Sequence, residues 1–329
     1  MSEQLITPQD MAAVVLARAT ESRNHGGSRG PGPDIQTIDW ATFWSNDSTG
    51  QEFVIAPLFP AGRQTVIYAP AKTGKSLFVM SIMAAAATGR SVLGNQPQPR
   101  VRVLYLDMEM TLADVKERLT DMGYGEADDL SHFQYCLLPN LPPLDSEDGG
   151  RRLMELVRYH RSHIVVIDTM SRVVSGPEDA SDTYRNFYRY TGMPLKDAGV
   201  ALVRLDHTGK DVGRGPRGSS SKNDDPDVVF RLTASGPASL KLRREMTRVH
   251  WIPEELLVKR LNSPHLSFQA SAGSGGLSDK TMELVKFLDD LAIPPSVSGD
   301  RACEILRGKG HSGSKRNVLD AQRYRMSRP

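Results

Sequence analysis

The stretch "YAPAKTGKS" (residues 68–76) decides the fold that this sequence predicts. An apolar run precedes it and "SLFVMSIMAAAATG" (76–89) follows, so we expect a strand, a tight turn and a buried helix that ends at Gly89. A helix that starts directly after such a turn presents unpaired backbone N–H groups and the positive end of its dipole to an anion. We therefore predict a phosphate-binding loop made of Ala69, Pro70, Ala71, Lys72, Thr73, Gly74, Lys75, Ser76 and Leu77.

Several positions of this loop have a clear chemical reason. Gly74 allows the backbone to close around a phosphate, Lys75 brings a positive charge to the outer phosphates, and the Ser76 hydroxyl is a ligand for Mg²⁺. The usual pattern, G-x-x-x-x-G-K-[ST], begins with glycine, whereas this chain has Ala69. Alanine is the smallest substitute, and we expect Pro70 to fix the bend instead. A chance "GKS" in a surface turn is the alternative, but the flanking strand and helix favour a working site for ATP and Mg²⁺.

Apolar runs along the rest of the chain predict the fold class. Four of them recur with helical patterns between them, at 64–70, 102–109, 163–170 and 200–207. Strands that alternate with helices are typical of an α/β fold with a mostly parallel sheet. Four further runs follow without intervening helices, which indicates an antiparallel extension of the sheet. These runs are 227–234, 238–245, 254–261 and 265–270.

One of the helical patterns, "TLADVKERLTDMG" (111–123), has the marks of an amphipathic helix. Thr111 and Asp114 form a plausible capping box at its start. Apolar residues at helical spacing are typical of a single buried face. The residues on this stripe are Leu112, Val115, Leu119 and Met122.

Polar residues at strand ends are the candidates for catalysis. Asp168 ends "IVVID" and is the expected carboxylate next to Mg²⁺. Glu109 ends "VLYLDME", where it can orient or deprotonate the attacking water; Asp107 is expected on the same face of that strand and remains an alternative. Glu109 is preferred because ligands bind at the carboxyl edge of open parallel sheets. His207 ends the fourth strand and can sense the γ-phosphate, although a structural role is as consistent with a lone histidine.

Composition limits the class of protein. Of 329 residues, 39% are hydrophobic and 24% charged, which is ordinary for a globular protein, and the net charge of +2 means that any nucleic-acid surface must be local. The two cysteines, Cys136 and Cys303, are too few for a disulfide framework or a metal cluster, which fits a reducing compartment. There is no hydrophobic signal core and no apolar run long enough to span a bilayer, so we expect a cytoplasmic protein.

Glycine, proline and serine runs divide the chain into four parts. Residues 1–34 are expected to hold an amphipathic helix (2–23) and a flexible linker, and residues 35–270 the nucleotide-binding core. A second linker covers 271–279. The part 280–329 shows three helical patterns and a basic end, so it is either a small domain that reads DNA, of winged-helix or helix-turn-helix type, or a basic disordered tail.

The phosphate loop, followed in order by "YLDMEM", "VVIDTM" and "RLDHTGKD", resembles the RecA-like ATPase core of the DnaB/RepA type of hexameric replicative helicase. It is most similar to the short plasmid and phage RepA-like ATPases, over about residues 53–235. The resemblance implies that Glu109 is the catalytic glutamate and Asp168 the Walker B aspartate. It places His207 at the sensor position, where the DnaB branch usually has glutamine. Ala69 and His207 depart from the family pattern.

The same resemblance implies a DNA-contacting loop and an arginine finger. The segment 207–225 is rich in glycine, serine and basic residues; a solvated mobile loop is the plain alternative, but in RecA-like rings this loop lines the central pore. The phosphate contacts expected from it are Lys210, Arg214 and Arg217. The basic strand "KLRREMTR" (241–248) resembles the one that carries the finger into the site of a neighbouring subunit, and we expect that finger to be Arg243 or Arg244.

Together these features predict an ATP-driven DNA helicase or translocase of replication, a ring that couples ATP hydrolysis to movement on single-stranded DNA. Two alternatives remain open. One is a RecA-like recombination or repair ATPase that coats DNA without unwinding it, and the other is a DNA-binding regulator or loader that ATP switches. The expected partners are single-stranded DNA, further copies of the chain in a homo-hexamer or other ring, and a replication initiator or loader protein.

Overall fold

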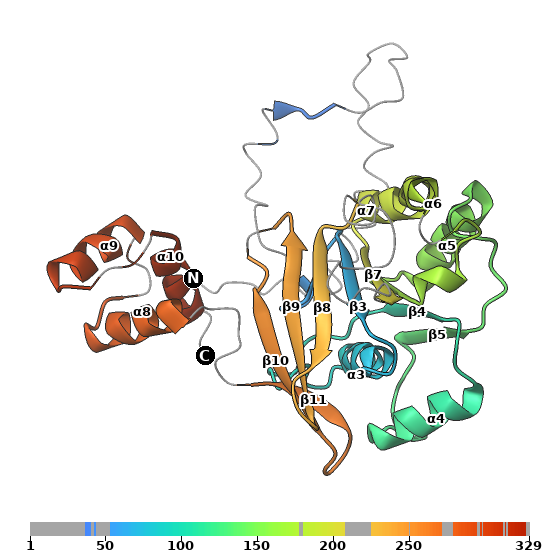
Figure 1. Cartoon of the computed structure of the whole chain (residues 1–329), viewed down its shortest axis with the longest axis horizontal. Coiled ribbons are helices and arrows are strands. Elements are labelled where there is room, and N and C mark those ends of the chain that lie inside the picture. The colour runs from blue at the N-terminus through green and yellow to red at the C-terminus, as the bar shows by residue number, and fades with distance from the viewer. Residues whose placement is uncertain are drawn as a thin grey trace.

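The computed structural model describes residues 37–40, 43, 53–177, 180–207, 225–249, 251–271, 279–294, 297, 299–311, 313 and 315–326. Two predicted features lie outside these residues: the helix expected over 2–23, and the loop with Lys210, Arg214 and Arg217. The described residues form a large sheet with helices on both faces, and three further helices near the C-terminus (Figure 1). None of the described helices is long and apolar enough to cross a membrane.

The nine-stranded sheet combines a parallel part with an antiparallel side (Figure 1). Its strands, in order across the sheet, are β11 (Ser267–Ala270), β10 (Glu255–Leu261), β9 (Ser239–Thr247), β8 (Val228–Ala234), β3 (Gln64–Ala69), β7 (Ala201–His207), β6 (Ile164–Asp168), β4 (Val103–Asp107) and β5 (Phe133–Leu137). Neighbours from β8 to β5 are parallel, and β8 to β11 pair in antiparallel fashion. The predicted fold class, a mostly parallel α/β sheet with an antiparallel extension, is confirmed.

Helices cover both faces of the parallel part. One hydrophobic cluster joins the sheet to α3 (Lys75–Thr88) and α4 (Leu112–Asp121). A second cluster joins the opposite face to α5 (Glu147–His160), α6 (Ser181–Phe187) and α7 (Met193–Asp197). The remaining short elements are β1 (Phe53–Ile55), β2 (Phe59–Pro60), the 3-10 turn η1 (Met170–Arg172) and the π-helical turn η2 (Tyr188–Gly192). Because β4 and β6 are buried on both faces, their sequences are nearly continuous apolar runs rather than alternating ones.

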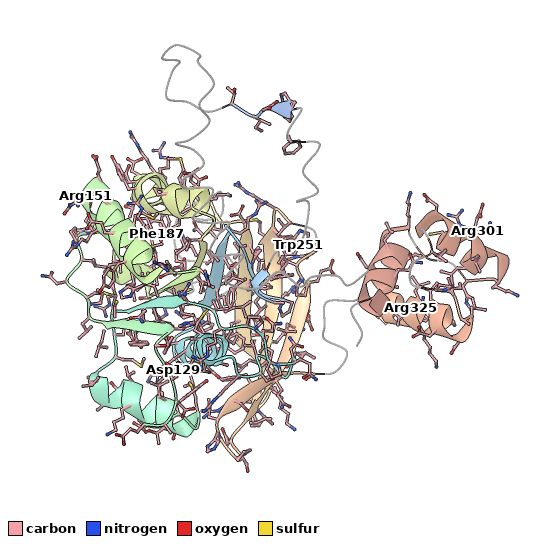
Figure 2. All side chains as sticks on the ribbon, turned by 180° about the vertical axis from the view of Figure 1, so that it is seen from behind. Asp129, Arg151, Phe187, Trp251, Arg301 and Arg325 are labelled. Carbon is pink, nitrogen blue, oxygen red and sulfur yellow. The ribbon has the colours of Figure 1, made fainter. Side chains whose placement is uncertain are left out.

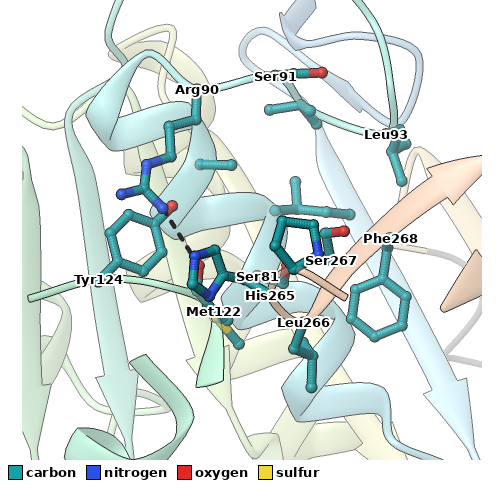
Figure 3. A pocket seen from close by; sticks show the side chains of 14 residues that line it. Ser81, Arg90, Ser91, Leu93, Met122, Tyr124, His265, Leu266, Ser267 and Phe268 are labelled. Carbon is teal, nitrogen blue, oxygen red and sulfur yellow. Dashed lines mark hydrogen bonds between the residues drawn. The ribbon is translucent and has the colours of Figure 1, made fainter. Parts of the chain in front are cut away.

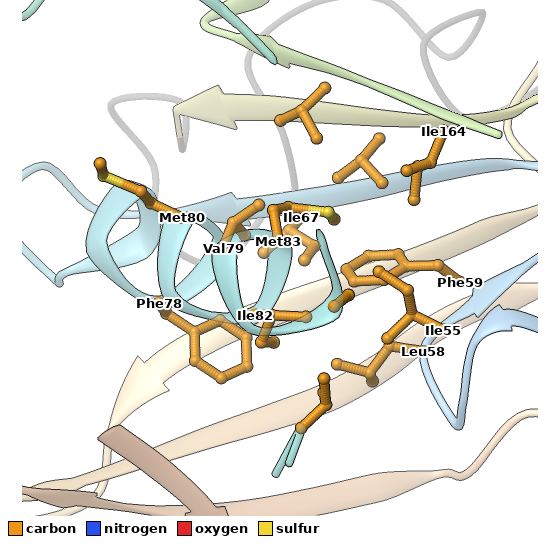
Figure 4. Packing of buried hydrophobic residues seen from close by; sticks show 14 of the residues in the cluster. Ile55, Leu58, Phe59, Ile67, Phe78, Val79, Met80, Ile82, Met83 and Ile164 are labelled. Carbon is orange, nitrogen blue, oxygen red and sulfur yellow. The ribbon is translucent and has the colours of Figure 1, made fainter. Parts of the chain in front are cut away.

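The helix α3 is largely buried, and Figure 4 shows its apolar side chains packed against the sheet. Phe78 and Val79 are fully buried in the cluster that also holds Ile67 of β3. Full burial of a side chain of this size stabilises a fold by about 1.5–3 kcal/mol. The predicted end at Gly89 is confirmed, since Gly89 has φ 75° and its N–H bonds back to the carbonyls of the last turn. Packing along its whole length therefore holds the start of α3 in place.

The structure corrects two details of the predicted secondary structure. β5 was not predicted, because its run "FQYCL" is mostly half-buried and carries a weak apolar signal. Leu112 was expected on the buried stripe of its helix, but it is 74% exposed, whereas Val115 one turn later is buried. Leu112 is the first residue of α4, ahead of the part that packs on the sheet. The capping box between Thr111 and Asp114 is present.

The three helices near the C-terminus have a hydrophobic cluster of their own. They are α8 (Asp279–Asp290), α9 (Gly299–Gly308) and α10 (Lys315–Met326), and they coincide with the three predicted helical patterns. Arg325 is nearly buried and donates to Asp289 Oδ1 and to the Ile293 carbonyl, while Arg301 is exposed beside Glu304; both arginines are labelled in Figure 2. Between residues 279 and 326 the described chain contains these three helices and no strand.

Candidate active site

The predicted phosphate loop joins the carboxyl end of β3 to the start of α3. Ala69 is the last residue of β3 and is fully buried within the strand, so the turn begins after it. Thr73 closes the turn, because its backbone N–H and its hydroxyl both donate to the Pro70 carbonyl, at 3.4 and 2.7 Å. Lys72 (φ 65°) and Gly74 (φ 90°) have left-handed backbone conformations. The bend expected at Pro70 is present, and Gly74 supplies the conformation that L-residues rarely adopt.

The first turn of α3 is built to receive an anion. Gly74 is its N-cap, and among the described residues no side chain caps the helix and no acidic residue lies in its first turn. The N–H groups of this turn and the positive end of the dipole are therefore left for a ligand. A Cβ added to Gly74 would meet nothing within 4 Å, so there is open space beside the loop. Lys75 is only 5% exposed, which places its positive charge inside the site.

Asp168 lies opposite this turn. It is the last residue of β6, separated from β3 in the sheet by β7, and only 3% of it is exposed. Burial raises the pKa of its carboxyl group, and the Lys75 charge and the hydroxyls of Ser76 and Tyr105 oppose that shift. The Tyr105 hydroxyl donates to Asp168 Oδ2 at 2.9 Å. The structure thus brings together Lys75, Ser76 and Asp168, which the sequence analysis had selected from different elements.

The turn after β4 corrects the prediction for Asp107. β4 ends at Asp107, two residues earlier than predicted, so Asp107 and Glu109 do not share one face of a strand. Asp107 is 1% exposed, and its Oδ1 accepts the backbone N–H groups of Glu109 (2.8 Å) and Met110 (3.1 Å). Its Oδ2 accepts the Tyr135 hydroxyl. Asp107 therefore shapes the turn that carries Glu109, and these hydrogen bonds occupy both of its oxygens.

Glu109 lies at the exposed rim of the site. Its side chain is 40% exposed, and its Oε1 accepts the Thr169 hydroxyl at 3.3 Å and lies 3.9 Å from Arg172 Nε. Thr169 follows Asp168 directly, and the Met108 N–H donates to the Asp168 carbonyl at 2.8 Å. Glu109 and Asp168 therefore come together at the carboxyl ends of two neighbouring strands, where the sequence predicted a shared site.

His207 ends β7 as predicted and lies directly across the β3–β7 ladder from Ala69. It is partly exposed. This register puts His207 next to the start of the phosphate loop and directly before the segment 208–224, which lies outside the described residues. The position suits a residue that touches both a bound phosphate and the following segment.

The two candidates for the arginine finger differ in their surroundings. Arg244 is 14% exposed at its side chain, which donates to the Ile252 carbonyl and lies beside Glu254. Arg243, its neighbour on β9, is exposed. Arg244 therefore helps to fix the β9–β10 connection, whereas the Arg243 side chain lies on the surface of the described fold.

A cavity of 230 Å³ opens elsewhere, between the end of α3, the end of α4 and β11 (Figure 3). Arg90, Tyr124 and His265 line it, and none of the predicted site residues does. The Arg90 guanidinium lies 3.9 Å from the centre of the Tyr124 ring and donates to the Gly123 carbonyl and to Asp128. These contacts engage Arg90 within the fold, so we assign the cavity no part in catalysis.

The residues around the phosphate loop fit Mg²⁺ bound together with a nucleotide. Ser76 and Asp168 place a hydroxyl and a carboxylate side by side, and both are oxygen ligands of the kind that this cation prefers. Among the described residues no group of three or more histidine, cysteine, aspartate or glutamate side chains could hold a metal ion. Mg²⁺ is usually bound through one or two protein ligands and the phosphates of the substrate.

A phosphate loop between a strand and a buried helix, facing an aspartate at the end of a nearby parallel strand, defines a P-loop nucleotide-binding protein. A family model described as "AAA domain" matches residues 37–213, which is more than half of the chain. The chain belongs to this family of P-loop ATPases, and the resemblance is confirmed at that level. A comparison with curated proteins finds no match.

Some residues of the site were not found from the sequence. Tyr105 sits two positions before Asp107 on β4, so it faces the same side of the sheet, but an apolar run that contains a tyrosine predicts only a buried strand. Thr169 and Arg172 follow Asp168 in "IDTMSR", and their contacts with Glu109 depend on how β4 and β6 pair. In the sequence, only their closeness to the predicted catalytic residues pointed to Tyr105, Thr169 and Arg172.

Proposed function

We propose that this site hydrolyses ATP and that hydrolysis drives movement of the protein on DNA. The observation that carries the first part is the meeting of Lys75, Asp168 and Glu109 at one edge of the sheet. Phosphate binding, cation binding and water activation each need one of these groups, and phosphoryl transfer needs little beyond such positioning and charge stabilisation.

Each residue has a distinct role in this proposal. The N–H groups at the start of α3 and the Lys75 ammonium bind the β- and γ-phosphates. Ser76 and Asp168 hold Mg²⁺, which neutralises charge on the phosphate oxygens when it is bound. Glu109 accepts a proton from the attacking water or orients it, because its carboxylate is exposed at the rim while Thr169 fixes one of its oxygens.

A neighbouring subunit completes the proposed site. In this proposal Arg243 reaches the γ-phosphate of the ATP that is bound to the adjacent subunit. There it stabilises the charge that develops while the phosphoryl group is transferred. The antiparallel side of the sheet supports this role, because it carries Arg243 on a strand that is held in the fold by its pairing with both β8 and β10. His207 passes the state of the phosphate site to the segment 208–224. In this proposal Lys210, Arg214 and Arg217 of that segment bind the phosphates of single-stranded DNA, and the chains form a homo-hexamer or other ring.

We infer further that the chain is a replicative helicase of DnaB/RepA type, loaded by an initiator or loader protein. What supports this is the order of the motifs around Lys75, Glu109, Asp168 and His207, together with the antiparallel strands after the core. A strand-coating recombination ATPase and a switched regulator share the ATPase core, so an activity must separate them.

Strand displacement on a forked DNA duplex tests the proposal. The wild type should displace the strand with ATP and Mg²⁺, and Lys75→Ala should abolish both displacement and hydrolysis. Lys116→Ala removes an exposed lysine on α4 and serves as the matched control, with activity unchanged. DNA-stimulated hydrolysis without displacement would overturn the helicase assignment and favour the two alternatives; closed rings in particle images would then exclude a filament.

The C-terminal helices, of which α10 is basic, are proposed to add a contact with duplex DNA. Removing residues 277–329 should weaken duplex binding and leave basal hydrolysis intact, because α8, α9 and α10 pack mainly on one another. Unchanged duplex binding after the deletion would overturn this assignment.

A further inference from the structure

Tyr105 is fully buried in β4, and its hydroxyl lies 2.9 Å from Asp168 Oδ2. Its ring is stacked on Tyr135, with ring centroids 4.9 Å apart and an interplanar angle of 12°. Phe133 packs against it edge to face, at 6.1 Å. Tyr105 and Tyr135 are also cross-strand partners in the β4–β5 ladder. The ring contacts and the pairing of β4 with β5 therefore fix the direction in which the Tyr105 hydroxyl points.

The orientation of the Asp168 carboxylate depends on that hydroxyl. The last torsion of an aspartate side chain has broad, two-fold minima, so the backbone of β6 does not determine which oxygen faces which neighbour. The hydrogen bond from Tyr105 engages Oδ2. The other oxygen, Oδ1, is buried and accepts no hydrogen bond within the described part of the chain, and the Ser76 hydroxyl, the second expected Mg²⁺ ligand, lies close to the same carboxylate. One oxygen is thus fixed, and the other is left for a ligand.

We propose that Tyr105 is a positioning residue that holds the Asp168 carboxylate so that Oδ1 is presented to Mg²⁺. This inference rests on the proposed ATPase function and adds a residue to it. The Tyr105 hydroxyl is the donor in this hydrogen bond, because an ionised carboxylate oxygen can only accept.

Tyr135 provides a matched comparison within the same aromatic stack. Its hydroxyl donates to Asp107, the carboxylate that shapes the Glu109 turn, rather than to Asp168. The two tyrosines thus orient two different carboxylates from adjacent strands. Tyr105→Phe and Tyr135→Phe each remove a single oxygen and keep the stacked ring, so they differ mainly in which carboxylate loses its donor.

Binding of a fluorescent ATP analogue, titrated with Mg²⁺ and repeated in EDTA, separates the two roles in the full-length protein. Tyr105→Phe should leave the affinity in EDTA unchanged, because the phosphate loop is intact. Tyr105→Phe should raise roughly tenfold the Mg²⁺ concentration at which half of the Mg²⁺-dependent gain in affinity for the analogue is reached. A change of this size is expected for the loss of a hydrogen bond to a charged group. Tyr135→Phe should leave that Mg²⁺ concentration unchanged. Without nucleotide, thermal unfolding should show that the two variants lower the midpoint temperature by similar small amounts.

Two results would overturn the inference. The first is an equal Mg²⁺ shift in Tyr105→Phe and Tyr135→Phe, which would mean that the stack acts only through stability. The second is a further loss of Mg²⁺ dependence when Tyr105→Phe is added to Asp168→Asn. A residue that acts through Asp168 should have no further effect on Mg²⁺ dependence once that carboxylate is replaced. Failure of the wild type to bind the analogue, or a wild type that is indifferent to Mg²⁺, would instead reject the proposed function itself.

Discussion

Gly74 and Gly89 lie at the two ends of α3, and replacing each by alanine separates the stability of this helix from its capacity to hold a phosphate. Both glycines have left-handed backbone conformations, with φ 90° and 75°. Alanine in this region costs about 1–2 kcal/mol. Space is not limiting, since a Cβ at Gly74 meets nothing within 4 Å and one at Gly89 lies 3.4 Å from Arg100 Cγ and from the Gln98 carbonyl oxygen.

We expect Gly74→Ala and Gly89→Ala to lower the free energy of unfolding by similar amounts, about 1–2 kcal/mol each. Only Gly74→Ala should weaken ATP binding. Relief of the strain rotates the peptide groups that begin α3, and the N–H groups of Lys75 and Ser76 then no longer converge on the phosphate. Loss of one hydrogen bond to a charged group costs about 1.5–3 kcal/mol, which raises the dissociation constant roughly tenfold or more.

Two measurements decide the outcome. Chemical denaturation of each variant gives the loss of stability, and calorimetric titration with ATP and Mg²⁺ gives the affinity. Similar stability losses with an affinity loss in Gly74→Ala alone would support the reasoning. Equal affinities in the two variants would refute it, because the start of α3 would then have no special part in phosphate binding.

Three further outcomes are expected. Arg243→Ala should lower hydrolysis by the assembled protein on the order of 10³-fold with little change in stability, whereas Arg244→Ala should lower the unfolding midpoint, because it loses contacts inside its own chain. Burial lowers the pKa of His163 to about 4, and its Nδ1 accepts the Arg102 N–H at 3.2 Å. The unfolded chain takes up this proton from about pH 6.5 downward and the folded chain only near 4. The free energy of unfolding should therefore fall by about 3 kcal/mol over that interval, and His163→Gln should flatten the pH dependence. Asp227→Ala should lower the free energy of unfolding, measured by urea denaturation, by about 3 kcal/mol. This buried carboxylate pairs with partly exposed Lys196 and Arg63 and accepts the Gln64 N–H.

The sequence was most informative where one element determines the answer. The phosphate loop, the cap at Gly89 and the capping box at Thr111 are local patterns, and each was predicted from a short window. The continuous apolar run that ends in Asp168 also indicated a buried parallel strand, because a strand covered on both faces needs such a run.

The sequence was least informative where two segments meet. Whether Asp107 or Glu109 lies at the exposed rim depends on where β4 ends, and the Asp107 side chain sets that end because it caps its own turn. The choice between Arg243 and Arg244 depends on Glu254 and the Ile252 carbonyl, which approach only after β9 and β10 pair. A window of sequence contains no such partners, so these contacts could not be predicted from it.

The strand that leads into the phosphate loop, β3, occupies the fifth place among nine and is hydrogen-bonded on both sides to parallel partners, β7 and β8. To shift β3, two ladders would have to open together, so its amide protons should be among the slowest in the chain to exchange with deuterated water. In the proposed ATPase we therefore expect any conformational change on loss of the terminal phosphate outside β3. Among the described residues, the exposed Glu109 side chain at the rim of the site is less constrained than β3, and the sheet is the stationary base beneath it.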